Sequence, residues 1–309
     1  MSAVISPSPI TISLQELMNL RHSGESLQLS PRQSTASQSG GYRAKLKGRG
    51  MEFDEVRPYT NGDDVRMLDW KVTARTNKPH TKLFREEHER PIQLCVDLRP
   101  GMFFATRGVY KSVWSSQAAA LLAWGSLKQG DRLGGLVFSN EGHSELRPVS
   151  GRRGVLSFLK VLAEQSVWNE PPVSSSNDEA LYQSLLRLRR VTRPGSLVFI
   201  FSDFSGIDKR SEAQLYHLGR HNDLVLVACF DPLDKQLPEH GNYTVDDGRR
   251  RLRFGTEDRQ YRKAYASVFS ERLVQLQKLS HLRGISLITC ETTDDPLQSL
   301  KAALGMRKR

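Results

Sequence analysis

Short apolar runs alternate with segments of helical periodicity in the part of the chain that follows residue 91. The strand-like runs, which are apolar almost throughout, cover residues 92–97, 133–138, 197–203, 224–230 and 285–290, with a shorter one at 145–148. Segments with apolar residues at helical spacing lie between them, at residues 109–128, 155–165, 179–190, 211–219, 261–281 and 296–304. Apolar strands separated by helices are typical of a sheet covered on both faces. The pattern therefore predicts an α/β fold with a doubly wound, mainly parallel sheet over residues 91–309.

Residues 1–41 are rich in Ser, Pro and Gln, which predicts a mostly flexible N-terminal segment. One short part of it differs, because Ser13 and Glu16 have the spacing of a capping box. The apolar residues at helical spacing behind this cap are Leu14, Leu17, Met18 and Leu20. We expect a short amphipathic helix here, docked on the body of the protein or on a partner, and a linker over residues 31–41.

Residues 42–90 predict a small accessory region that contains β structure. Residues 51–59 and 81–87 have strand-like patterns, and Asn61-Gly62 is typical of a tight turn. Asp63 or Asp64 is expected to cap a helix after that turn. The apolar residues of this helix would be Val65, Leu68, Trp70 and Val72.

The same region holds an unusual mixture of acids, bases and aromatic residues between residues 48 and 75. Such a mixture predicts a polar network packed under aromatic cover, or a recognition surface. Arg66 and Asp69 are three residues apart, so they could pair on the predicted helix. The acids also resemble a nuclease site, but the interleaved arginines would neutralise them and favour an ion-pair network. The residues assigned to this network are Glu52, Arg57, Asp63, Asp64, Arg66, Asp69, Trp70 and Arg75.

Composition adds limits on location and partners. The formal charge of +11 and the pI of about 9.7 suggest either an acidic partner or nothing more than solubility, and the basic clusters are spread over several elements. The chain has no apolar run of about 18 residues, the length that spans a bilayer, and its first residues lack signal-peptide features, so we expect a cytoplasmic protein. Three cysteines lie in or at the end of apolar runs without a CxxC pair, which predicts buried, unreactive thiols.

Several polar positions are candidates for binding. Asp97, Asp203 and Asp231 follow predicted strands, and the ligand crevice of a doubly wound sheet lies beyond the carboxyl ends of its strands. Three carboxylates there could provide oxygen ligands for Mg²⁺. His217 and His221 have the spacing of a zinc pair but lack a third ligand, so a role at a helix C-terminus is the favoured interpretation. Residues 151–154 (Gly-Arg-Arg-Gly) open a predicted helix and could hold a phosphate, but a turn with exposed arginines is preferred.

Part of the chain resembles a known family. The block Glu52-Phe53-Asp54-Glu55-Val56-Arg57 is followed by Gly62-Asp63-Asp64-Val65-Arg66, Asp69-Trp70, Ala74-Arg75, Asp231-Pro232-Leu233 and Pro238 with Gly241. These motifs resemble the bacterial "domain of unknown function 58" family, in which such a block is joined to a von Willebrand factor A-like domain. The resemblance implies an accessory or adaptor protein whose partners are a MoxR-type AAA+ ATPase and other von Willebrand A proteins. Longer members carry a transmembrane pair upstream, which is absent here and favours a soluble form.

The resemblance also implies a degenerate metal-ion-dependent adhesion site. The intact site needs Asp-x-Ser-x-Ser after the first strand, a later Thr and an Asp after the fourth strand. Here the first motif reads Asp97-Leu98-Arg99-Pro100-Gly101, Asp203 stands at the fourth strand, and one of Ser174 to Ser176 could replace the Thr. Our hypothesis is that Arg99 pairs with Asp97 or Asp203 and substitutes for the ion. We therefore expect no cofactor, and any Mg²⁺ that did bind would use Asp97 and Asp203.

These considerations favour a non-enzymatic adaptor that mediates protein–protein interaction with a MoxR-type AAA+ ATPase. The docking face would be either the charged block of residues 52–75 or the top of the sheet around Asp97 and Asp203. The alternative is a basic protein that binds nucleic acid or another anionic surface, whose affinity would fall steeply with salt. An enzyme ranks third, since the sequence offers no nucleophile–base pair, phosphate loop or intact metal motif.

Overall fold

The computed structural model describes residues 8–29, 51–60, 65–86, 90–170, 179–246 and 251–305. The chain forms two compact units, which are described separately below. Residues 33–89 form the small unit, and residues 1–32 together with 90–309 form the large unit. Where the sequence predicted three parts, the structure thus groups the N-terminal residues with the large unit.

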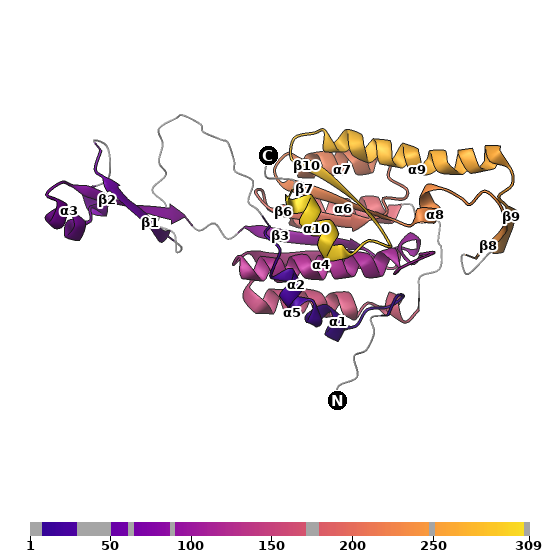
Figure 1. Cartoon of the computed structure of the whole chain (residues 1–309), viewed down its shortest axis with the longest axis horizontal. Helices are drawn as coiled ribbons and strands as arrows, with labels where there is room; N and C mark the ends of the chain where they lie inside the picture. Colours follow the sequence, from indigo (N-terminus) through magenta and orange to yellow (C-terminus); the bar gives the residue numbers. More distant parts are fainter. Residues whose placement is uncertain are drawn as a thin grey trace. The chain divides into compact units, whose positions relative to one another are not determined.

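A six-stranded sheet forms the centre of the large unit (Figure 1). Its strands lie in the order β10-β7-β6-β3-β4-β5, and all neighbours are parallel except β4 and β5. This arrangement confirms the predicted doubly wound, mainly parallel sheet. The strands are β3 (Pro91–Asp97), β4 (Arg132–Phe138), β5 (His143–Ser150), β6 (Leu197–Ser202), β7 (Asp223–Phe230) and β10 (Ile285–Glu291).

Helices cover both faces of this sheet, and each face has its own hydrophobic core. One face packs against α6 (Glu179–Val191), α7 (Lys209–Gly219) and α9 (Arg259–Ser280). The other face packs against α1 (Leu14–Asn19), α2 (Arg21–Gly24), α4 (Lys111–Lys128), α5 (Gly151–Ala163) and α10 (Pro296–Gly305). Three short helical turns complete the described part of the unit, at η2 (Pro100–Met102), η3 (Ser166–Trp168) and α8 (Pro232–Lys235).

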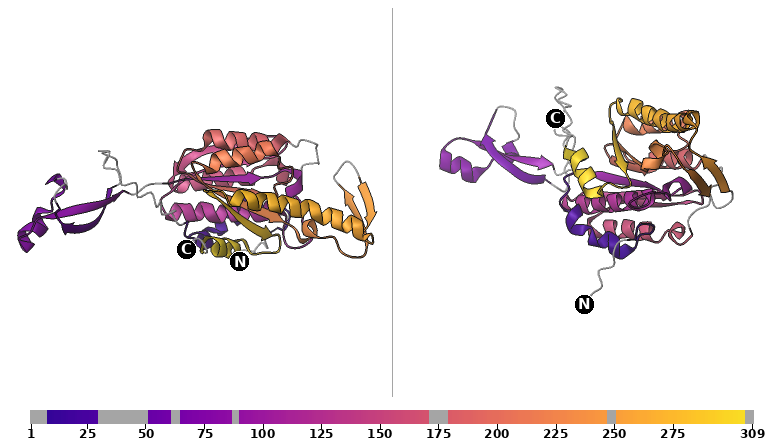
Figure 2. Two further views of the ribbon diagram at one scale, coloured as in Figure 1. Left: turned by 90° about the horizontal axis from the view of Figure 1, so that it is seen from above. Right: turned by 45° about the vertical axis from the view of Figure 1, so that its right-hand side comes forward.

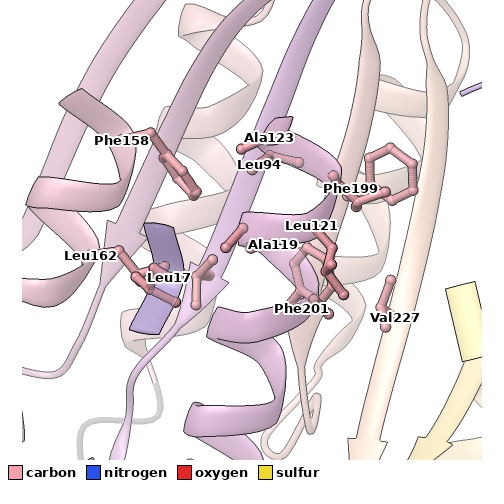
Figure 3. Packing of buried hydrophobic residues seen from close by; sticks show 14 of the residues in the cluster. Leu17, Leu94, Ala119, Leu121, Ala123, Phe158, Leu162, Phe199, Phe201 and Val227 are labelled. Carbon is pink, nitrogen blue, oxygen red and sulfur yellow. The ribbon is translucent and has the colours of Figure 1, made fainter. Parts of the chain in front are cut away.

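The N-terminal helix is part of the core. The predicted capping box is confirmed, because the Ser13 side chain accepts from the Glu16 amide while the Glu16 carboxylate accepts from the Ser13 amide. Leu17 is fully buried and lies near Phe158 and Leu162 of α5 (Figure 3). The indole Nε1 of Trp124 in α4 donates to the Leu17 carbonyl at 3.0 Å. The predicted amphipathic helix therefore docks on the body of its own chain.

A hairpin that the sequence pattern did not predict follows α8 in the large unit. Strands β8 (Asn242–Asp246) and β9 (Arg251–Gly255) pair with each other and lie beside the N-terminal end of α9 (Figure 2). The ring of Phe254 packs between those of Tyr243 and Tyr261. Arg262 of α9 donates to three backbone carbonyls at the base of the hairpin, those of Glu239, Thr256 and Glu257. An isolated two-stranded hairpin has only marginal stability in water, and these contacts with α9 stabilise this one.

The small unit is a β-hairpin with one short helix. Strands β1 (Met51–Pro58) and β2 (His80–Glu86) are antiparallel and confirm the two predicted strands. Between them lie the 3₁₀ turn η1 (Val65–Met67) and the helix α3 (Trp70–Thr76). The predicted Asn61-Gly62 turn falls outside the described residues.

The predicted start of the helix in the small unit was wrong. Asp69 is the N-cap of α3, and its carboxylate accepts hydrogen bonds from the amides of Lys71 and Val72 at 3.0 and 3.1 Å. The expected caps, Asp63 and Asp64, lie outside the described residues. Trp70 is therefore the first helical residue, and its side chain is 70% exposed rather than part of an apolar face. Val65 precedes the helix and is 62% exposed.

Candidate functional site

The order of the strands creates one topological switch point in the sheet. The chain passes from β3 to β4 on one side, whereas β6 leads to β7 and β10 on the other side. In open α/β sheets a ligand crevice lies beyond the carboxyl ends of the two strands at such a point. Asp97 ends β3 and Asp203 directly follows β6, so the structure brings these two predicted residues to the switch point.

Arg99 binds Asp97 through a forked arrangement. Its Nε lies 3.0 and 2.9 Å from the two carboxylate oxygens, and its Nη2 lies 2.7 Å from Oδ2. The Asp97 carboxylate has no exposed surface, and it also accepts from the Arg99 amide and from the Ser202 hydroxyl. The predicted pairing of Arg99 with Asp97 is confirmed. Two charge-assisted contacts from a planar guanidinium are the geometry that best compensates a buried carboxylate.

Asp203 lies between two cations. Its Oδ1 is 3.6 Å from Arg99 Nη2, and its Oδ2 is 3.6 Å from Lys111 Nζ. Burial alone would raise the pKa of Asp203, but Lys111 and Arg99 outweigh burial and hold the pKa below its usual range. Arg272 of α9 adds a hydrogen bond to the Asp203 carbonyl at 3.1 Å. The loop after β6 is thus attached to β3, α4 and α9.

Lys111 is a member of this site that sequence reasoning missed. It begins α4, is almost fully buried, and donates to Asp234 at 2.9 Å as well as facing Asp203. Burial would lower the pKa of Lys111, but the two carboxylates raise it above its ordinary value. The available signal was its place as the first residue of a helix rich in Ser, Ala, Leu and Trp. We call Asp97, Arg99, Lys111, Asp203 and Asp234 the switch-point cluster.

Gly101 explains how the cluster closes. A Cβ atom on this residue would lie 2.7 Å from Oδ2 of Asp203, so only glycine leaves room for that carboxylate. Nearby, Phe204 is fully buried with a φ of 51°, a left-handed conformation that is costly for an aromatic residue. The Ser202 hydroxyl accepts from the Phe204 amide at 2.8 Å and holds this turn. The loop geometry is therefore fixed by packing around Asp203.

Asp231 does not share this site, although it also follows a strand. Its carboxylate accepts from the hydroxyls of Thr106 and Thr292 at 2.7 and 2.9 Å and from the amides of Thr106 and Leu233. Burial would raise the pKa of Asp231, but these hydrogen bonds lower it. A capping box with Asp234 links Asp231 to the switch-point cluster. Asp231 therefore joins three loops, and the expectation that it would form a common ligand set with Asp97 and Asp203 was wrong.

The donor set of the cluster does not fit a metal ion while Arg99 is in place. Guanidinium nitrogens already contact both oxygens of Asp97, and Asp203 faces the two cations. Within the described ranges, no group of three His, Cys, Asp or Glu side chains could hold an ion. Ser174 to Ser176, the candidates for the missing Thr, lie outside the described residues. The cluster is a buried ion-pair assembly that ties loops together.

The predicted network of the small unit is only partly described. Arg57 donates to the Thr60 hydroxyl at 2.7 Å, and Asp69 caps α3 as above. Arg66 lies in η1, ahead of the helix on which it was expected to pair with Asp69, and Arg75 is exposed on α3. The Glu52 backbone pairs with Arg85 in the hairpin. Trp70 does not cover a network, because most of its surface is open to solvent.

The remaining candidates have structural roles. His217 lies exposed in the last turn of α7, and His221 lies beyond the helix, in agreement with the preferred interpretation. Residues 151–154 open α5 and their two arginines are exposed, in agreement with the preferred interpretation. All three cysteines are buried and free, as predicted, and burial raises the pKa of the Cys229 thiol to about 12.

Comparisons with known proteins establish the family. The model of the family described as "Protein of unknown function DUF58" matches residues 55–274, so the chain belongs to the DUF58 family. Uncharacterized proteins of Mycobacterium tuberculosis and Mycobacterium bovis are each 27% identical to it over 271 residues, which is 87% of this chain and 84% of theirs. The family resemblance expected from the residue 52–75 block is therefore confirmed.

Two solved structures are similar at lower identity. The conserved hypothetical protein BatB from Bacteroides thetaiotaomicron is 10% identical, with a TM-score of 0.43 over 70% of this chain and 96% of that one. An aerotolerance-related membrane protein from Bacteroides fragilis is 12% identical, with a TM-score of 0.43 over 69% and 96%. In the part of the chain that the structure describes, no helix has both the length and the apolar character needed to cross a bilayer.

Proposed function

We propose that this protein is a non-enzymatic, cytoplasmic accessory factor that binds a MoxR-type AAA+ ATPase through its small unit. The partner class comes from the family resemblance of the block at residues 52–75. The role as an adaptor rests on what the small unit presents to solvent.

The observation that carries the proposal is the exposure of Trp70. Its side chain is 70% exposed on α3, a short helix that Asp69 caps. Val65, which precedes that helix, is 62% exposed. Tryptophan is the residue type most enriched at the energetic centre of protein interfaces. Exposure of a large apolar side chain to water is unfavourable, so burying it against a partner would contribute favourable free energy to binding.

The switch-point cluster supports the same proposal from the other unit. The crevice where a doubly wound sheet would take a small ligand is filled by Arg99 and Lys111 of the chain itself. Their carboxylate partners are buried and charge-paired, which is unlike a general acid or base that must reach a substrate. Recognition of another protein surface does not need that crevice.

The test is affinity purification of the tagged full-length chain from its native cells, at moderate salt and after nuclease treatment. We expect an AAA+ ATPase to co-purify with the wild type and to be lost with Trp70→Ala. The matched control is Tyr216→Ala, which removes an aromatic side chain that is 44% exposed on α7 of the large unit. Thermal melting of both variants separates lost binding from lost folding.

Two results would refute the proposal. Equal recovery of the ATPase by wild type and by a folded Trp70→Ala variant would remove the small unit from the interface. Recovery of nucleic acid alone, falling steeply as salt rises, would support the alternative of a basic polyanion-binding protein.

A further inference from the structure

We infer that α3 inserts Trp70 into an apolar pocket of the partner protein whose rim is acidic. This inference rests on the proposed function, and it adds the chemistry of the surface that receives the small unit. It is carried by the arrangement of charge around Trp70.

Four exposed side chains share one side of α3. A helix turns by about 100° per residue, so Trp70, Lys71, Ala74 and Arg75 fall within an arc of about 140°. Thr73 falls outside this arc, about 60° from Trp70, and its hydroxyl accepts from the His80 amide of β2 at 3.0 Å. This hydrogen bond attaches α3 to the hairpin, while the indole and the two cations remain exposed.

The charge that the described residues place on this face is positive. Lys71, Arg75 and Lys78 are exposed, and no ion pair joins any of them to another described residue. The nearby acid, Asp69, uses its carboxylate to cap α3. Lys71 and Arg75 are also four residues apart, and like charges at that spacing disfavour a helix. A seven-residue helix that carries such a pair beside an open Trp is better suited to binding than to its own stability.

The small unit as a whole is nearly neutral, which favours an acidic protein over nucleic acid. Residues 33–89 contain eleven Lys and Arg against nine Asp and Glu. A protein that binds DNA tightly neutralises about six to ten phosphates, whereas the described residues of this face offer two cations, Lys71 and Arg75. Complementary carboxylates around an apolar pocket need only that local match, and they would steer the approach of the two proteins.

Trp70 itself provides the readout. The chain has four tryptophans, and the other three, Trp114, Trp124 and Trp168, are 1%, 1% and 6% exposed. Acrylamide quenching of the full-length chain therefore reports mainly on Trp70. The purified ATPase from the co-purification is titrated into the chain, and Trp70→Phe, under the same conditions, gives the background from all other tryptophans.

We expect the ATPase to protect Trp70 from quenching. Reversing the two positive charges beside Trp70 in Lys71→Glu/Arg75→Glu should weaken binding about tenfold and reduce the salt dependence of binding. Removing the anchor in Trp70→Ala, followed by calorimetry, should weaken binding about thirtyfold or more. The matched control is Arg152→Glu/Arg153→Glu, which reverses two exposed charges at the start of α5 and should bind like wild type.

The outcomes separate this inference from the proposed function. If the ATPase binds but the Lys71→Glu/Arg75→Glu variant binds as tightly as wild type, the acidic rim is wrong and the adaptor role stands. If no ATPase is recovered with the wild type, both fail. Protection of Trp70 by a single-stranded oligonucleotide at physiological salt would replace the protein pocket with nucleic acid.

Discussion

Replacing Arg99 tests whether the switch-point cluster holds the large unit together. Arg99→Met keeps an unbranched apolar stem of similar shape but removes the guanidinium, which leaves the fully buried Asp97 carboxylate without its cation. Breaking a buried ion pair from one side costs about 3–5 kcal/mol. The Ser202 hydroxyl and the residue 99 amide still donate to Asp97, so we expect a loss near the lower end, about 3 kcal/mol.

The assay is thermal and urea unfolding of the full-length chain, followed by far-UV circular dichroism. For a unit of this size about 1 kcal/mol shifts the melting temperature by about 2–4 °C, so Arg99→Met should melt about 6–12 °C lower. The double variant Asp97→Asn/Arg99→Met buries no charge and should recover at least half of that loss. Arg210→Ala, which removes an exposed pair with Glu179, should leave the melting temperature unchanged within error.

Two results would refute the reasoning. A loss below about 1 kcal/mol for Arg99→Met would mean that the pair is no stronger than a surface pair. If Asp97→Asn/Arg99→Met were less stable than Arg99→Met, the unpaired Asp97 carboxylate would not be the cause of the instability of Arg99→Met.

Three further predictions concern the same cluster. Gly101→Ala should destabilise the chain by about 1–3 kcal/mol in urea titrations, because its Cβ would lie 2.7 Å from the Asp203 carboxylate; an unchanged midpoint would contradict this packing. The pKa of Asp203 is lowered from 3.8, so its contribution to stability is fully present above pH 3.8 and is lost as the pH falls below that value. The pKa of Lys111 is raised from 10.5, so its contribution is fully present below pH 10.5 and is lost as the pH rises above that value. The urea midpoint should therefore fall at both extremes, and Asp203→Asn should flatten the acid limb. Calorimetry with Mg²⁺ at low-millimolar concentration should give no saturable heat with the wild type; a heat that disappears in Asp97→Ala would show that an ion competes with Arg99.

Most of the large unit could be predicted because its elements have strong local periodicity. In β6 and β7 nearly all consecutive residues are apolar, which predicts strands that are buried on both faces. The β8–β9 hairpin was missed although polar and apolar residues alternate along Arg251-Leu252-Arg253-Phe254, and its stability comes from Tyr261 and Arg262 of a different element. In the small unit, Asp69 competes with the earlier acids for the same capping role, and spacing alone did not decide between them.

The site was predicted in part. Asp97, Arg99, Gly101 and Asp203 were identified from a motif and from the ends of strands, and the structure brings all four together. Lys111 carried no comparable signal, because a lone lysine at the start of a helix usually points to water. Its burial beside Asp203 depends on how closely α4 packs on the sheet.

The sequence by itself determined the fold class, the position of most strands and helices, the buried thiols and the family of this protein. These properties follow from the order of residue types over short stretches, which local sterics and solvation are enough to interpret. The tertiary structure decided which charges meet. Arg99 is only two residues from Asp97, but its second partner, Asp203, follows a strand that lies beside β3 through the order of the sheet. It also decided that Trp70 is exposed: Asp69, rather than Asp63 or Asp64, caps the helix, which therefore begins at Trp70, and the Trp70 side chain is 70% exposed.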